Sequence, residues 1–129
     1  MMEKYDPEIA PDPAVWLELD EGERILAIED YHRAARISLP KAARRSHAAF
    51  HAVVENQVAL NQEPVVRALR RLMDQGLSRH DAVHAIASVL AEEIFDGVSL
   101  DDSSETANAR YFAAVERLTA KSWHDGNDG

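Results

Sequence analysis

Apolar residues recur about every three or four positions along most of this chain, which is the period of an amphipathic α-helix. In residues 21–36, for example, Ile25 and Ile28 share one face with Ala35, and the charged residues fall at other positions. No stretch long enough to form a strand alternates apolar and polar residues. The pattern therefore predicts an all-α protein.

Prolines, glycines and capping residues divide this pattern into separate helices. Pro40 and Pro64 stand where a first helical residue is expected, and Gly76 marks the end of a helix. Asp20 to Glu23 and Ser78 to Asp81 have the spacing of capping boxes, in which side chains bind the first backbone N–H groups of a helix. The expected helices cover residues 21–36, about 40–60, 64–76, 79–97 and about 101–122.

Helices of this number and length, joined by short loops, predict a compact bundle of four to five helices. The chain has 129 residues, which is enough for a single domain, 1–129, with its own core. The prolines and charges of residues 1–12 predict an irregular N-terminal arm, followed by a short turn from Asp12 through Trp16. Residues 124–129 are expected to form a frayed, disordered tail.

The charges are segregated along the chain, although their sum is −9. Residues 31–80 carry nine bases and three acids, whereas both flanking parts are acidic. A basic segment can bind nucleic acid, and residues 64–97 could form a helix-turn-helix. We favour another interpretation, in which the basic segment pairs with the acidic ends. The overall acidity and the acidic surface expected for residues 79–97 argue against a nucleic-acid partner.

Composition excludes several classes of site. The chain has no cysteine, so a metal would have to be held by histidine and carboxylate. No segment approaches the about 18 uninterrupted apolar residues of a membrane span, and no signal peptide is recognisable, so we expect a cytoplasmic protein without a membrane partner. No phosphate-binding loop or cofactor fingerprint occurs, which predicts no organic cofactor.

Two helices each carry a pair of histidines four residues apart, and these pairs are the main candidates for chemistry. The pairs are His47 with His51 and His80 with His84. Residues at this spacing lie on one face of a helix, where two ring nitrogens can bind one cation. Glu55 extends the first pair by one more turn, which gives the predicted metal ligands His47, His51, Glu55, His80 and His84.

Other residues on the expected helices could complete this site. His32 lies on an apolar stripe three residues after Glu29, and Glu92 follows His84 by two turns; these three are possible additional ligands. Imidazole and carboxylate suit zinc, iron, manganese or nickel, and the sequence does not choose among them. A bound metal could activate water in a hydrolase or bind oxygen in an iron protein.

A different class of function is compatible with the same residues. Buried histidines also form hydrogen-bond networks, here with Glu55 and Gln57 as partners. In that case the chain would be a non-enzymatic helical interaction module, and a homodimer would be its expected assembly. Whether it is an enzyme is left open by the sequence.

The histidine motifs resemble those of a small bacterial family of unknown function. The run from His47 to Gln57 is followed by Arg79 to His84 and then by Leu90-Ala91-Glu92. The family pairs an HxxxHxxxxEQ-like helix with an HxxxH helix that ends in LxE. The resemblance covers about residues 40–95 and implies a helical fold and the histidine pairs, but no reaction. In this chain Asn56 separates Glu55 from Gln57, which departs from the family pattern.

Two better-known classes share parts of these motifs and are not preferred. His80-Asp81 resembles the HD phosphohydrolases, but Asp81 is explained by its place in a capping box. The His51-x3-Glu55 and His80-x3-His84 spacings resemble hemerythrin-like bundles, which bind two irons and oxygen. Here a whole helix separates the two motifs, and the last helix lacks a matching His-x4-Asp.

Overall fold

A computed structural model of the chain describes residues 4–37, 43–97 and 104–127. Within these ranges it contains seven helices and no strand, which confirms the all-α prediction. The helices are α1 (Pro13–Glu18), α2 (Glu21–Ala34), α3 (Arg44–Ala59), α4 (Glu63–Asp74), α5 (Arg79–Gly97), α6 (Ser104–Arg117) and α7 (Ala120–Asn127). None of the described helices is long and apolar enough to cross a bilayer.

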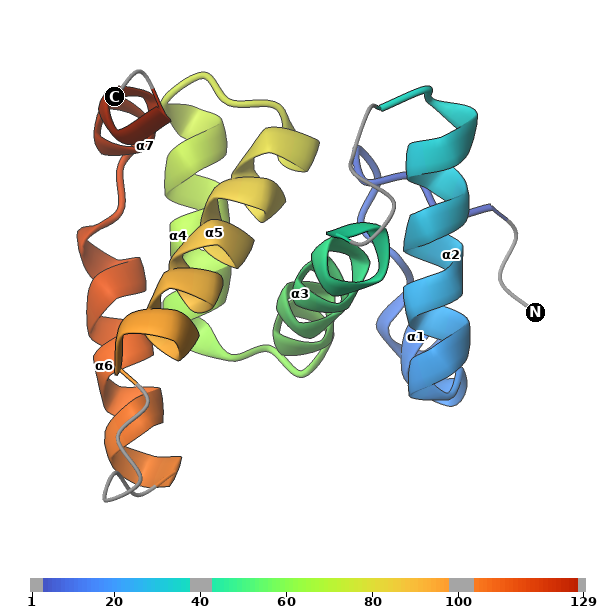
Figure 1. The fold of residues 1–129 in the computed structure, drawn as a ribbon, viewed down its shortest axis with the longest axis horizontal. Helices are drawn as coiled ribbons and strands as arrows, with labels where there is room; N and C mark the ends of the chain where they lie inside the picture. Colours follow the sequence, from blue (N-terminus) through green and yellow to red (C-terminus); the bar gives the residue numbers. More distant parts are fainter. Residues whose placement is uncertain (1–3, 38–42, 98–103, 128–129) are drawn as a thin grey trace.

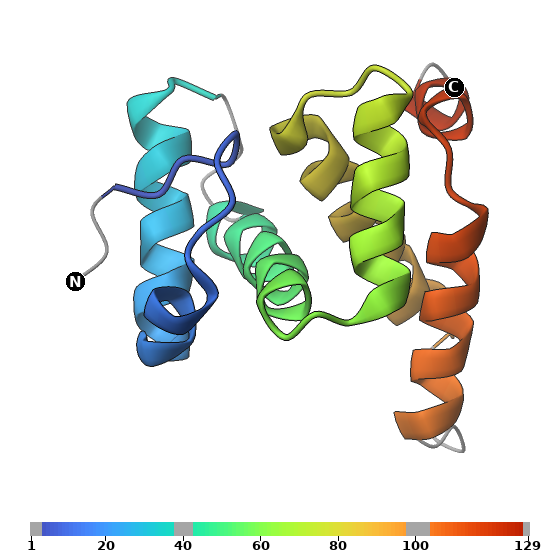
Figure 2. The same ribbon diagram turned by 180° about the vertical axis from the view of Figure 1, so that it is seen from behind.

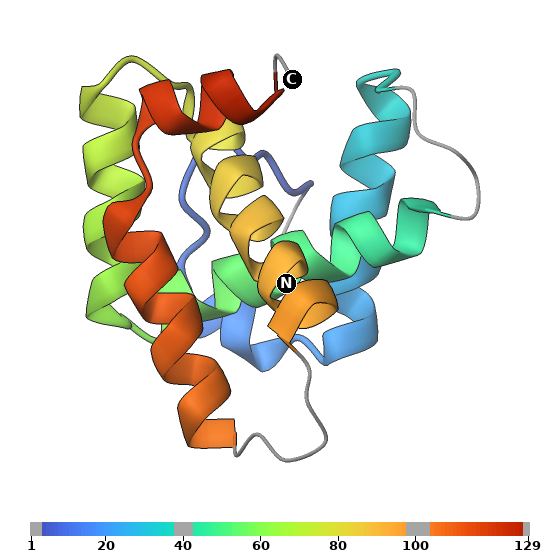
Figure 3. The same ribbon diagram turned by 60° about the vertical axis from the view of Figure 1, so that its left-hand side comes forward.

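Helix α3 is the central element of the fold (Figure 1). Helices α1 and α2 pack against one side of it, and α4 and α5 pack against the other side (Figure 2). Helix α6 packs against both α4 and α5, while α7 lies across one end of this group (Figure 3). Because α3 is covered from two sides, polar residues along it can be buried.

The predicted capping boxes determine where two helices begin. At the start of α2, the Asp20 carboxylate accepts a hydrogen bond from the Glu23 backbone N–H at 2.8 Å, and the Glu23 carboxylate accepts one from Asp20 N–H at 3.0 Å. At the start of α5, Ser78 Oγ accepts a hydrogen bond from Asp81 N–H at 3.1 Å. These bonds satisfy backbone donors that have no partner within the helix.

The C-terminal part of the chain forms two helices, where the sequence predicted one helix and a tail. Thr119 and Ser122 cap each other's backbone N–H groups at 3.0 Å, which starts the separate helix α7 after α6 has ended. Helix α7 continues to Asn127, so residues 124–127 are helical. The helix starts predicted at about residues 40 and 101 lie outside the described residues.

The buried apolar residues form two clusters, and α3 contributes to both. The larger cluster lies between α3, α4, α5 and α6 and includes Val54, Leu72 and Ile86. The smaller cluster joins the N-terminal arm, α1, α2 and α3, and Trp16 and Ile28 are completely buried in it. Helix α3 therefore lies at the boundary between two cores.

The C-terminal half of α3 is joined to other helices by polar side chains. Asn56 Oδ1 accepts a hydrogen bond from the Trp16 indole of α1 at 2.9 Å. Its neighbour Gln57 accepts one from the Tyr111 hydroxyl of α6 at 2.7 Å. These bonds fix the rotation of α3 about its own axis, and hence the directions in which its histidines point.

Ion pairs between helices connect the basic middle of the chain to its acidic flanks. Arg45 of α3 pairs with Glu29 of α2 at 3.0 Å, and Arg67 of α4 pairs with Glu116 of α6 at 2.5 Å. Both arginines are more than half exposed, so each pair contributes little to stability. The pairing agrees with the interpretation that the basic segment complements the acidic ends.

Candidate metal centre

Five of the six histidines meet where three helices come together. His32 is in the last turn of α2, His47 and His51 are in the first half of α3, and His80 and His84 are in the first turns of α5. The ring centroids of His47 and His51 lie 4.4 Å apart, and those of His51 and His80 lie 5.8 Å apart. The structure thus brings together both predicted histidine pairs and also His32.

The five side chains form two groups of three that share one member. His47, His51 and His84 make one group, and His32, His51 and His80 make the other. In each group, one ring nitrogen from each residue lies within 4.8 Å of the corresponding atoms of the other two. We call them the outer triad and the inner triad, because His47 and His84 are partly exposed whereas His32 and the shared His51 are buried.

The shortest contact in the outer triad joins α3 to α5. His51 Nε2 lies 3.3 Å from His84 Nδ1. Two nitrogens bound to the same tetrahedral zinc, with bonds of about 2.0–2.1 Å, lie about 3.3–3.4 Å apart. The two rings therefore already have the separation of neighbouring ligands.

Two ring nitrogens of the inner triad are buried without a hydrogen-bond partner. His32 Nδ1 lies 2.8 Å from the Ile28 carbonyl oxygen, so it carries the proton and donates, which leaves a lone pair on Nε2. This Nε2 and His51 Nδ1 both lack a partner. A buried polar atom without a partner costs about 1–3 kcal/mol, so such atoms indicate a function or a missing ligand.

The surroundings keep four of the rings neutral. Burial, reinforced by the neighbouring histidines, lowers the pKa of His51 to about 2 and that of His47 to about 4. Burial also lowers the pKa of His80 and of His84. A neutral imidazole is the form that binds a metal, so the ligands need not lose a proton near neutral pH.

None of the three predicted carboxylates is a member of either triad. Glu55 is completely buried, but it binds the guanidinium of Arg79. Glu29 pairs with Arg45, and Glu92 is exposed on α5. Neither triad includes a carboxylate. The centre that the structure describes is made of histidine alone.

The buried pair of Glu55 and Arg79 holds α3 and α5 together beside the histidines. Two parallel hydrogen bonds of 2.8 and 2.9 Å join the carboxylate to the guanidinium. The guanidinium also donates to the Pro7 carbonyl at 2.9 Å, and the Tyr5 hydroxyl donates to Glu55. Glu55 follows His51 by one turn, and Arg79 directly precedes His80. The ion pair therefore sets the position of His51 relative to His80.

Sequence reasoning did not identify Arg79 and Tyr5 as parts of this arrangement. Arg79 is one of the nine bases expected to pair with the acidic ends, and Tyr5 lies in the segment expected to be an irregular arm. One signal was present: Glu55 lies among apolar residues of α3, and a carboxylate buried there needs a cationic partner.

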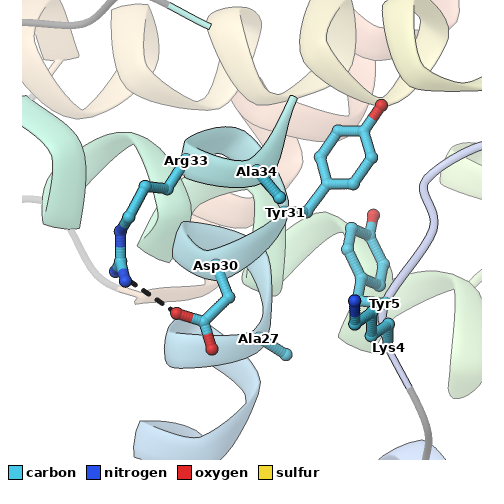
Figure 4. A pocket seen from close by; sticks show the side chains of 7 residues that line it. All are labelled: Lys4, Tyr5, Ala27, Asp30, Tyr31, Arg33 and Ala34. Carbon is cyan, nitrogen blue, oxygen red and sulfur yellow. Dashed lines mark ion pairs between the residues drawn. The ribbon is translucent and has the colours of Figure 1, made fainter. Parts of the chain in front are cut away.

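A cavity of about 550 Å³ lies beside the inner triad, between the N-terminal arm and α2 (Figure 4). Figure 4 shows Tyr5 and Tyr31 along one part of its wall and the ion pair of Asp30 with Arg33 along another. The Tyr31 ring also contacts His32 and His80, with centroids 5.6 and 5.4 Å apart. Tyr31 is therefore a wall shared by the cavity and the histidine cluster.

The fold and the site together define a helical protein with a five-histidine centre. Comparisons with models of protein families, with curated proteins and with solved structures gave no match to this chain. The function must therefore be argued from the centre itself.

Proposed function

We propose that this protein binds a divalent transition metal, and that the outer triad of His47, His51 and His84 is its primary site. The observation that carries the proposal is the 3.3 Å separation of His51 Nε2 and His84 Nδ1, two neutral ring nitrogens from different helices. His47 provides a third ring nitrogen, and one nitrogen from each of the three residues lies within 4.8 Å of the others.

A metal accounts for this arrangement better than a histidine network without a metal. One hydrogen bond between His51 and His84 would satisfy one nitrogen of each ring. A metal would also bind a nitrogen of His47, because one ring nitrogen from each of the three residues lies within 4.8 Å of the others. Neither histidine pair binds Glu55 or Gln57, because these two residues bind Arg79 and Tyr111 instead.

The ligand set favours zinc over manganese, because manganese prefers oxygen ligands and the triad contains none. Three histidines are the ligand count of several catalytic zinc sites, which keep a fourth position for water or substrate. Zinc bound in this way lowers the pKa of its water to about 7. The proposed centre thus suits hydrolytic chemistry, and the partial exposure of His47 and His84 leaves it accessible from solvent.

Equilibrium dialysis of the untagged protein against zinc tests the proposal. We expect at least one zinc per chain in the wild type, and at least a tenfold weaker affinity after His51→Ala or His84→Ala. His124→Ala is the matched control, because His124 is exposed and belongs to neither triad. Equal zinc binding by the wild type and His51→Ala would overturn the proposal.

A further inference from the structure

His51 is the only residue common to both triads, and its two ring nitrogens have different surroundings. Nε2 lies 3.3 Å from His84 Nδ1, so it belongs to the outer triad. Nδ1 is buried and has no hydrogen-bond partner. The outer triad therefore leaves one nitrogen of His51 available for another ligand.

The inner triad offers further nitrogens beside that ring. His32 keeps its Nε2 lone pair free because its Nδ1 donates to the Ile28 carbonyl. The centroids of His32 and His80 lie 5.4 Å apart, and each ring lies within 6 Å of His51 (5.3 and 5.8 Å). His32 and His51 thus each have a buried nitrogen without a partner, and together with His80 they form a group in which one ring nitrogen from each residue lies within 4.8 Å of the others.

We infer that the protein holds two divalent metal ions, one in each triad, with the His51 ring bridging them. This inference rests on the proposed function and adds a second site, made of His32, His51 Nδ1 and His80. The two metals would share a single ring, so each would affect the affinity of the other.

The bridge requires one proton to leave His51. Neutral imidazole has one lone pair, so His51 can bind the first metal through Nε2 while Nδ1 keeps its proton. Binding of the second metal at Nδ1 releases this proton to solvent and leaves an imidazolate with one negative charge. That charge offsets part of the charge of the second ion.

Acidic side chains near the inner triad offset more of the positive charge. Asp81 on α5 and Asp6 and Glu8 on the arm all act on His80, and each raises its pKa against the larger lowering effect of burial. The Glu8 carboxylate is held close to this residue, because it accepts a hydrogen bond from the His80 backbone N–H at 3.0 Å. The second metal would therefore lie beside the acidic arm.

Copper(II) is a suitable probe, because two copper ions joined by an imidazolate couple their spins. We expect the wild-type protein to bind two copper ions per chain, with an integrated paramagnetic resonance signal at low temperature well below two spins. His32→Phe and His80→Phe keep a ring at each position but remove an inner ligand. Each should bind one copper and give a full signal of one spin, while His124→Ala should behave like the wild type.

The outcomes separate this inference from the proposed function. One copper in the wild type would overturn the inference of two metals, and if His32→Phe leaves that copper unchanged, the outer triad stands. Two coppers with a signal of two full spins would overturn the bridge. No copper in the wild type would overturn both. The spin count of the wild type alone shows whether His51 bridges two copper ions, even if the variants do not fold.

Discussion

Replacing Arg79 with methionine is expected to destabilise the protein by about 3–5 kcal/mol, the usual cost of removing one partner of a buried ion pair. The Glu55 carboxylate is fully buried, and the guanidinium supplies two of its hydrogen bonds. Methionine fills a similar volume but donates no hydrogen bond, so the variant must bury a charge or protonate Glu55. It also removes the bond that ties the Pro7 carbonyl to α5.

Urea unfolding of the Arg79→Met variant measures this effect, with Arg70→Met as a control at an exposed position of α4. The control should lose less than about 1 kcal/mol. Adding Glu55→Met to Arg79→Met should recover part of the loss, because no charge is then left buried. A loss below about 1 kcal/mol for Arg79→Met alone would show that the pair does not hold α3 to α5.

The metal-free protein is expected to lose stability steeply as the pH falls below about 6.5. Burial lowers the pKa of His51 to about 2, whereas its pKa in the unfolded chain is the ordinary value of 6.5. Between these values the unfolded state binds a proton that the folded state does not bind, so acid favours unfolding. His51 alone contributes about 1.4 kcal/mol of lost stability for each pH unit in this range. His47, whose pKa is also lowered by burial, acts in the same direction.

Unfolding free energies measured at pH 4.5, 5.5 and 6.5 with a chelator present test this expectation. The carboxylates of the chain also titrate at low pH, so the comparison is between the wild type and His51→Leu. The free energy of unfolding should fall less steeply in the variant than in the wild type. The difference in slope should correspond to about one proton, or about 1.4 kcal/mol for each pH unit. Parallel curves for the two proteins would mean that His51 is protonated in the folded state.

The sequence predicted the helices well where local chemistry determines them. Asp20 and Ser78 cap the helices that their spacing indicated, and His47 and His51 lie together on α3 as their spacing indicated. The break between α6 and α7 was missed, because Thr119 and Ser122 form a capping box without the usual acidic residue.

The meeting of the histidines was predictable only in part. Spacing along one helix predicts each pair, but the angle between α3 and α5 decides which members of the two pairs lie together. Here His84 lies with His47 and His51 of α3, whereas His80 lies with His51 and with His32 of α2. The role of Glu55 was not predictable from its spacing after His51, because its partners Tyr5 and Arg79 are 50 and 24 residues away along the chain.

The most direct test of the central claim is the zinc-edge X-ray absorption spectrum of the protein loaded with one equivalent of zinc. The outer triad predicts about three nitrogen ligands at about 2.0–2.1 Å, with the outer-shell scattering of imidazole rings, and one further light atom. The His124→Ala variant should give the same spectrum. A shell of oxygen ligands without imidazole scattering, or a zinc that dialyses away from the wild type, would contradict the claim that these histidines form a metal centre.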